Sequence, residues 1–325
     1  MTFARRQFLQ LAARAAAVPT VLSFARAQTY PTRPVRIIVG FAPGGASDLL
    51  ARLMGQWLSG RLGQPFVVEN RPGAATNIAT AAVVRAPPDG YTLLQITIIN
   101  AWNATLYHNL NFDFMRDIAP VASIYRAPGV MEVSPSFPAK TVPEFIAYAK
   151  ANPGKINMAS GGTGGAPHVY GELFKMMAGV DMLHVPYRAT PLAITALLAG
   201  EVHVMFDTLA TSIEHIRTGK LRALAVTAAT RVEVLPEIPT VGEFVSGYEA
   251  SGWQGVGAPR YTPIEIIDSL NKEINAGLAD RTMQGRIASI GGTVFASSPI
   301  EFGKFIADET EKWGKVIRAA NIKPE

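Results

Sequence analysis

The sequence contains no cysteine among its 325 residues. Disulfide bonds, thiolate catalysis and cysteine-based zinc sites are therefore excluded. Charged residues are also sparse, at 17% of the chain, whereas 48% of the residues are apolar. This composition is typical of a compact globular protein, and the length is sufficient for two domains.

The chain also lacks an apolar run of the roughly 20 residues that a membrane span needs. The apolar stretch near the N-terminus is interrupted by Arg14 and Pro19. It follows a basic start at residues 5–9 (RRQFL) and precedes residues 25–27 (ARA), which have the form of a signal-peptidase site. We therefore predict that residues 1–27 are an export signal peptide with a twin-arginine-like start. A membrane anchor and an ordinary secretory signal are the alternatives.

Little net charge remains once this leader is set aside. The four arginines of the leader are not balanced by any acid, and without them 26 basic residues face 25 acidic ones. The mature chain therefore has no general basic field of the kind that attracts nucleic acid or membranes. We expect no nucleic-acid partner.

The mature chain alternates between apolar runs of strand length and segments of helical periodicity. This order predicts an α/β protein with parallel strands and right-handed crossovers. Strands are predicted at residues 35–41, 66–68, 91–96, 156–159, 182–185, 202–206 and 221–227. Helices are predicted at residues 49–58, 74–85, 143–151, 168–178, 192–198, 213–218, 263–278 and 299–319. Residues 110–119 are expected to form a loop near a domain crossing, and residues 231–252 a connection.

A glycine-rich loop follows the first predicted strand and runs directly into a helix. It comprises residues 41–48 (FAPGGASD). Glycine lets the backbone approach a ligand, and the first turn of a helix offers unpaired N–H groups and partial positive charge. The loop is therefore a candidate anion site. The alternative is a tight turn in which Ser47 or Asp48 caps the helix without a ligand.

A second loop of this kind lies in the middle of the chain, at residues 160–167 (SGGTGGAP). Four glycines and two hydroxyl side chains are more than a turn requires, and Pro167 suits the first helical position. This composition favours a cradle for an anion or a polar ligand. Neither loop matches a nucleotide-binding motif, because the G-x-G-x-x-G pattern fails at its last glycine and no P-loop lysine is present.

Polar residues also follow two other predicted strands. Thr97 and Asn100 come after one of them, and Asp207 after another. Because ligands of open α/β sheets bind beyond the carboxyl ends of the strands, these four loops are expected to converge on one cleft. A helix cap is the alternative role for Asp207.

Catalytic and metal-binding patterns are sparse. The five histidines show no compact metal-ligand spacing, and no G-x-S-x-G nucleophile elbow is present. A histidine at a helix start, such as His168, is more often a polar or capping residue than a base. We therefore expect no enzyme, no cofactor and no metal, and a hydrolase or lyase that uses Asp48 and His168 is the alternative.

The sequence resembles the Bug family, the periplasmic substrate-binding receptors of tripartite tricarboxylate transporters. The similarity covers essentially the whole mature chain. It is carried by residues 30–31 (YP), 41–48 (FAPGGASD), 63–73 (GQPFVVENRPG), 88–93 (PDGYTL), 185–188 (VPYR), 205–207 (MFD), 219–227 (GKLRALAVT) and 236–241 (PEIPTV). The sequence departs from the family pattern at residues 100–101, where the family often has His-Ala, and at residue 189, where glycine is common. Pro191 stands one place before the expected proline, and Pro167 is unusual before His168.

The resemblance implies a two-domain periplasmic-binding-protein fold of type II-like, Venus-flytrap form, with crossing strands at the hinge. Domain 1 would comprise residues 28–127 and 251–325, and domain 2 residues 128–250. The first glycine loop would bind one carboxylate through backbone N–H groups and ordered water, while the second loop and the loop after Asp207 would hold the variable end. The ligand would be a dicarboxylate or an aromatic carboxylate.

These arguments together predict a set of ligand-binding residues and of partners. We expect a monomer that passes its ligand to a cognate membrane permease, or alternatively a receptor that reports to a sensor kinase. The predicted ligand-binding residues are Phe41, Gly44, Gly45, Ala46, Ser47, Asp48, Thr97, Asn100, Ser160, Gly161, Gly162, Thr163, Gly164, His168 and Asp207.

Overall fold

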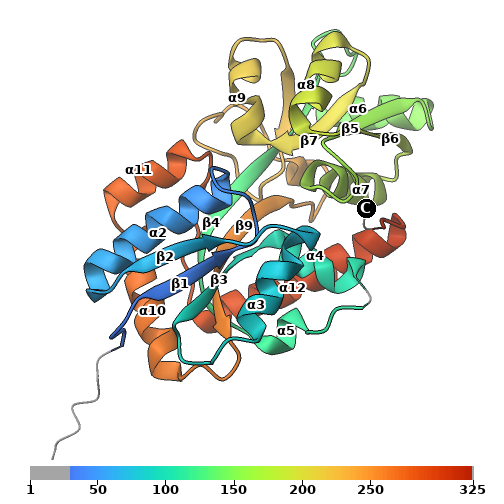
Figure 1. Cartoon of the computed structure of the whole chain (residues 1–325). Helices are drawn as coiled ribbons and strands as arrows, with labels where there is room; N and C mark the ends of the chain where they lie inside the picture. The colour runs from blue at the N-terminus through green and yellow to red at the C-terminus, as the bar shows by residue number, and fades with distance from the viewer. Residues whose placement is uncertain (1–29, 108, 324–325) are drawn as a thin grey trace, which may run out of the picture.

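The computed structural model describes residues 30–107 and 109–323, and the predicted export signal lies outside them (Figure 1). The strands are β1 (Val35–Val39), β2 (Phe66–Asn70), β3 (Thr92–Thr97), β4 (Ile118–Val133), β5 (Ile156–Ser160), β6 (Met182–Pro186), β7 (Val204–Thr208), β8 (Arg222–Val226), β9 (Ser251–Pro259) and β10 (Thr293–Val294). The predicted α/β architecture is confirmed.

Helices connect most of these strands. They are α2 (Ala46–Leu62), α3 (Asn77–Val84), α4 (Ile98–Leu106), α5 (Phe114–Asp117), α6 (Val142–Ala151), α7 (Ala166–Ala178), α8 (Thr190–Ala199), α9 (Leu209–Arg217), α10 (Ile264–Leu278), α11 (Arg281–Ser289) and α12 (Pro299–Ala319), with 3₁₀ turns η1 (Ala74–Thr76) and η2 (Val241–Glu243). Within the described ranges, no helix has both the length and the apolar character of a membrane span.

One long strand, β4, belongs to two sheet regions. Its first part, from Ile118 to Pro128, pairs antiparallel with β9, which also pairs with β3 beside the parallel strands β1 and β2. Its second part, from Gly129 to Val133, pairs antiparallel with β7 and β8, and β7 continues through β5 to β6 in parallel. Figure 1 shows β4 running from the lower α/β unit into the upper one.

Apolar clusters fill both units and the space between them. One cluster lies between α2, α10 and the β1 side of the sheet, and a smaller one lies beneath α8. The largest joins the two units, because it contains Trp102 of α4, Trp253 of β9 and Trp313 of α12 together with Phe174 of α7. The indole N–H groups of Trp253 and Trp313 both donate to the buried carboxylate of Glu309, at 2.9 and 2.7 Å.

Two local predictions were wrong. The helix expected at residues 74–85 begins only at Asn77, because Ala74, Ala75 and Thr76 form a left-handed turn with φ values of 46°, 47° and 73°. Residues 110–119 contain α5 and the start of β4, because Asp113 caps that helix by accepting the N–H of Arg116 at 3.0 Å.

Candidate ligand-binding site

The first glycine loop is held in place by Asp48, which is only 2% exposed. Its Oδ2 accepts the backbone N–H of Gly44 and Nε of Arg52, each at 2.9 Å. Its Oδ1 accepts Nδ2 of Asn70 at 2.9 Å. The carboxylate thus ties together the loop, α2 and the end of β2.

This network keeps the carboxylate ionised. The hydrogen bond from Arg52 holds the pKa of Asp48 at about 2, and the bonds from Gly44 and Asn70 lower the pKa further against the opposing effect of burial. A carboxylate with three hydrogen bonds and so low a pKa is a poor proton acceptor. Its role here is to position the loop.

The remaining residues of this loop present backbone groups. The carbonyl oxygen of Phe41 accepts Nδ2 of Asn70 at 3.0 Å. Gly45 stands at the N-cap of α2 and no side chain caps the helix there, while Ser47 is buried in the first turn. Gly44 has φ of +89°, which favours glycine, and a side chain built there would meet no atom within 4 Å. The first N–H groups of α2, from Ala46 on, therefore lack a side-chain acceptor.

Three helices of the other unit begin in the same way. α7, α8 and α9 follow the carboxyl ends of β5, β6 and β7, and no side-chain cap occupies their N-cap residues Gly165, Ala189 and Thr208. Away from these strand ends, α5, α6, α11 and α12 do carry side-chain caps. Among the helices that directly follow strand ends, α4 has a capping box formed by Thr97 and Asn100, whereas α2, α7, α8 and α9 leave their first N–H groups for an anion. Elsewhere, α3 and α10 also lack side-chain caps.

The second glycine loop is organised by its own hydroxyl and imidazole groups. Ser160 Oγ accepts the N–H of Gly162 at 3.2 Å and lies 2.6 Å from Nε2 of His184. The N–H of Gly164 donates to Nδ1 of His168 at 3.0 Å. Gly161 packs so tightly that a Cβ there would lie 2.6 Å from the backbone nitrogen of Thr190, the first residue of α8.

His168 and His184 form a stacked pair, with ring centroids 3.6 Å apart and planes inclined by 4°. Burial, together with the neighbouring His168, lowers the pKa of His184 to about 4. Nδ1 of His168 accepts a backbone N–H, and its Nε2 lies 3.7 Å from Glu172, which also pairs with Lys175 at 2.9 Å. His168 therefore organises a helix start, as the polar or capping interpretation predicts.

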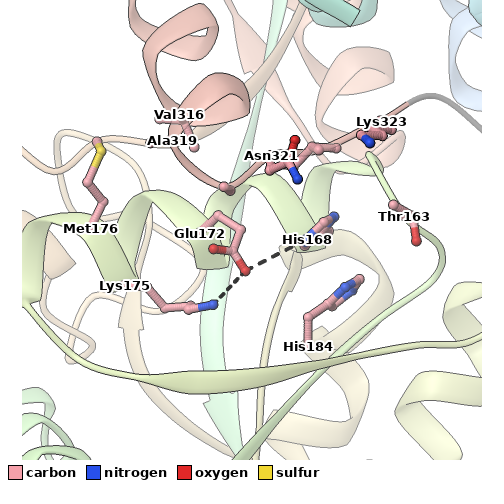
Figure 2. Close-up of a pocket in the computed structure, with 12 residues that line it drawn as sticks. Thr163, His168, Glu172, Lys175, Met176, His184, Val316, Ala319, Asn321 and Lys323 are labelled. Atoms are coloured by element: carbon pink, nitrogen blue, oxygen red, sulfur yellow. Dashed lines mark hydrogen bonds and ion pairs between the residues drawn. The ribbon is translucent and has the colours of Figure 1, made fainter. Parts of the chain in front are cut away.

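A cavity of about 810 Å³ lies beside this pair (Figure 2). It separates one face of α7 from the chain after α12, and Thr163, His168, Asn321 and Lys323 are among its lining residues. Among the described residues that line it, none belongs to the first glycine loop. A Cβ at Gly164 would lie 3.8 Å from the side chain of Ile322, so the chain after α12 also bounds the second loop.

Asn100 is committed to an internal network. Its Oδ1 accepts the N–H of Thr97 at 2.8 Å, and its Nδ2 donates to the hydroxyls of Thr76 and Thr80 at 3.2 and 2.9 Å. Asn100 is 2% exposed. Both of its amide hydrogens are used, so this side chain braces the start of α4 against the left-handed turn.

Asp207 is likewise buried, at 1% exposure, beneath the start of α9. Its Oδ2 accepts the hydroxyl of Thr211 and lies 3.3 Å from the Ser212 hydroxyl, whose single hydrogen is directed between Asp207 and Oε1 of Glu132, the latter at 2.7 Å. Burial raises the pKa of Asp207, and burial with the neighbouring Asp207 raises the pKa of Glu132 to about 8. Two carboxyl groups thus share one serine behind the strand end.

Sequence reasoning missed several of these residues. Glu132 was detectable as the single acid in an otherwise apolar run, VMEV, at residues 130–133. Pro72-Gly73 marks a turn, but it does not signal the left-handed conformation of the three residues that follow it. The role of Asn70 could not be seen, because its partners Phe41 and Asp48 are more than 20 residues distant. No three histidine, aspartate or glutamate side chains are grouped to hold a metal ion within the described ranges.

Two α/β units that share a long strand and direct uncapped helix starts toward the strand ends define a solute-binding receptor. The family model described as tripartite tricarboxylate transporter family receptor matches residues 50–322. The chain belongs to this family. It is 35% identical to the protein BugT of Bordetella pertussis over 91% of this chain and 92% of that one.

Solved structures of similar proteins support this assignment to the family. The R. palustris protein Rpa4515 with adipate is 37% identical, with a TM-score of 0.75 over 91% of this chain and all of that one. The periplasmic binding protein BugD is 33% identical, with a TM-score of 0.71 and the same coverage. The resemblance to the Bug family, the two-domain periplasmic-binding-protein fold and the prediction of a receptor instead of an enzyme are confirmed.

Proposed function

We propose that this protein is a periplasmic receptor that captures a small carboxylate between its two α/β domains and delivers it to a tripartite membrane permease. The observation that carries the proposal is that α2 in one unit and α7, α8 and α9 in the other begin at strand ends without side-chain caps. These backbone donors suit an anion.

The ligand class rests on the family. Helix N-termini alone accept phosphate and sulfate as readily as carboxylate. The structure of Rpa4515 contains adipate, a dicarboxylate. A dicarboxylate or an aromatic carboxylate is therefore the ligand that we propose for this chain, with the first glycine loop holding one carboxylate group.

We further propose that residues 28–127 and 251–325 form domain 1, and that residues 128–250 form domain 2. The change of partners along β4, from β9 up to Pro128 to β7 from Gly129, supports this division. A ligand stabilises the closed arrangement if it makes more favourable contacts there than in the open arrangement, as a ligand that contacts both domains does. We expect the protein to act as a monomer exported by residues 1–27.

Calorimetry and thermal melting with a panel of mono-, di- and aromatic carboxylates test the proposal. A ligand at 100 times its dissociation constant should stabilise the protein by about 2.7 kcal/mol. Phosphate, sulfate and the corresponding neutral amides serve as controls. If no carboxylate produces heat or a shift in melting temperature, or if sulfate binds as well as the best carboxylate, the proposed function is wrong.

Closure and partner choice need separate measurements. Small-angle scattering should show a smaller radius of gyration with saturating ligand, and an unchanged radius at saturation would contradict domain closure. Capture experiments with the permease and with sensor kinases distinguish transport from sensing. Binding to a sensor kinase alone would contradict delivery to a permease.

A further inference from the structure

Arg188 lies at the same edge of the sheet as the proposed site. It lies two residues after the end of β6, Pro186, and two residues before the start of α8, Thr190. Because β5, β6 and β7 are parallel, their carboxyl ends share one edge. The residue is exposed, and it lies between Tyr187, whose N–H donates to the carbonyl of Ser160 at 2.9 Å, and the uncapped N-cap Ala189.

Its position is fixed relative to the second glycine loop. Gly161 packs against Thr190, where a Cβ would lie 2.6 Å from the backbone nitrogen, and a Cβ at Gly162 would lie 3.9 Å from the carbonyl oxygen of Tyr187. The residues on both sides of Arg188 therefore touch the loop. The backbone that carries the guanidinium cannot move without displacing the second glycine loop.

Arg188 has no acidic partner among the residues that the structure describes. Beside the first glycine loop and the end of β2, Arg52 pairs with Asp48 at 2.9 Å and Arg71 with Glu69 at 2.6 Å, whereas Lys323 near the second loop has no acidic partner among the described residues. A guanidinium is always charged and can bind a planar carboxylate through two parallel hydrogen bonds. Arg188 is thus a cation available at this edge.

We propose that Arg188 is a specificity-determining residue that pairs with a second anionic group on the ligand and so selects dicarboxylates over monocarboxylates. The inference rests on the proposed function, in which the first glycine loop holds one carboxylate through its backbone. A ligand with a neutral distal end leaves the guanidinium unpaired as the domains approach. A ligand with a second carboxylate neutralises the charge of the guanidinium. The difference in binding free energy between the two ligands is the selectivity for dicarboxylates.

Matched pairs of ligands isolate this effect: adipate with hexanoate, succinate with butyrate, and terephthalate with benzoate. For at least one pair, the wild-type protein should bind the diacid about tenfold or more tightly than the monoacid, since a charge-assisted pair of hydrogen bonds forms only with the diacid. Arg188→Gln should remove this preference by weakening diacid binding while changing monoacid binding less than about twofold. Arg188→Glu should favour 6-aminohexanoate over adipate.

Arg217→Gln is the matched control, because Arg217 lies at the far end of α9 and pairs with Glu214. It should leave both affinities unchanged. Equal weakening of diacid and monoacid by Arg188→Gln, an unchanged preference in that variant, or a wild-type protein without diacid preference would overturn the inference. If monoacids still bind in these cases, the proposed function stands. If no carboxylate of the wider mono-, di- and aromatic panel binds the wild-type protein, both proposals fail.

Discussion

At the scale of single residues, most of the side chains predicted to contact the ligand instead hold in place the backbone N–H groups that we propose as the ligand contacts. Asp48 fixes the first glycine loop, and His168 and Ser160 fix the second. Asn100 holds the start of α4. These side chains form hydrogen bonds within the protein. The backbone N–H groups at the strand ends are then the donors that remain for the ligand.

Asp48→Asn should loosen the first loop. The change removes the ion pair with Arg52 while it conserves volume, and we expect about 1–3 kcal/mol of destabilisation and weaker ligand binding. Because the folded pKa of Asp48, about 2, lies below the usual value, its contribution is complete above pH ~4 and is lost as the pH falls towards 2. The stability gap between wild type and variant, measured by denaturation, should shrink over that window. A gap that is independent of pH would contradict this role.

Gly161→Ala should damage the second loop, since the added methyl would lie 2.6 Å from the backbone nitrogen of Thr190. We expect about 1–3 kcal/mol of destabilisation and a loss of ligand affinity. Gly60→Ala is the control, because a Cβ at this position inside α2 would meet no atom within 4 Å. It should be stabilising by about 0.5–1 kcal/mol. Similar melting temperatures for the two variants would refute the close packing.

At the scale of elements, the long amphipathic helices were predictable and the irregular ones were not. The sequence places α12 at its observed bounds, Pro299–Ala319, because its cap Ser298 and its periodicity are local signals. The left-handed turn at Ala74–Thr76 is imposed by contacts, since a Cβ at Gly40 would lie 2.6 Å from Cβ of Thr76. β4 was not predicted. Its 16 residues are shared by two sheet regions and are mostly apolar, without the alternation that indicates a half-buried strand.

Glu132→Gln tests the buried acid pair of β4 and β7. The pKa of Glu132 in the folded protein is raised to about 8. Between about pH 4.5 and 8 the carboxyl group ionises in the unfolded chain but stays protonated in the folded protein. The wild-type protein should therefore lose stability as the pH rises over this range. The variant should lack this part of the pH dependence and gain relative stability at pH 8. Glu214→Gln, at an exposed position on α9, is the control. Parallel stability curves for wild type and Glu132→Gln would contradict the raised pKa.

At the scale of the whole molecule, the two units are joined by more than the shared strand. The largest apolar cluster runs across both units, and Ile322, only 8% exposed, belongs to it; a Cβ at Gly164 of the second loop would lie 3.8 Å from its side chain. We therefore expect the proposed domain closure to keep this cluster packed. The ion pair of Arg126 with Glu249, at 3.3 Å, lies beside the point where β4 changes partners.

Ile322→Ala should affect stability and binding together. Removal of the buried side chain is expected to cost about 2–5 kcal/mol, and the loss of support for the second loop should weaken ligand affinity. Ile300→Ala, at a position on α12 that is 85% exposed, should change neither quantity. Calorimetric titration and thermal melting of the two variants decide the matter. Unchanged ligand affinity in Ile322→Ala would show that the chain after α12 does not support the loop.

The sequence by itself determined the α/β class, the two glycine-rich loops and the family, because each depends on residues close together in the chain. Only the tertiary structure decided that Asp48, Asn100, His168 and Asp207 are engaged in hydrogen bonds, and that Arg188 has no acidic partner among the described residues. Hydrogen bonds and ion pairs form between atoms within about 4 Å, and residues far apart in sequence reach that distance only when the sheet assembles.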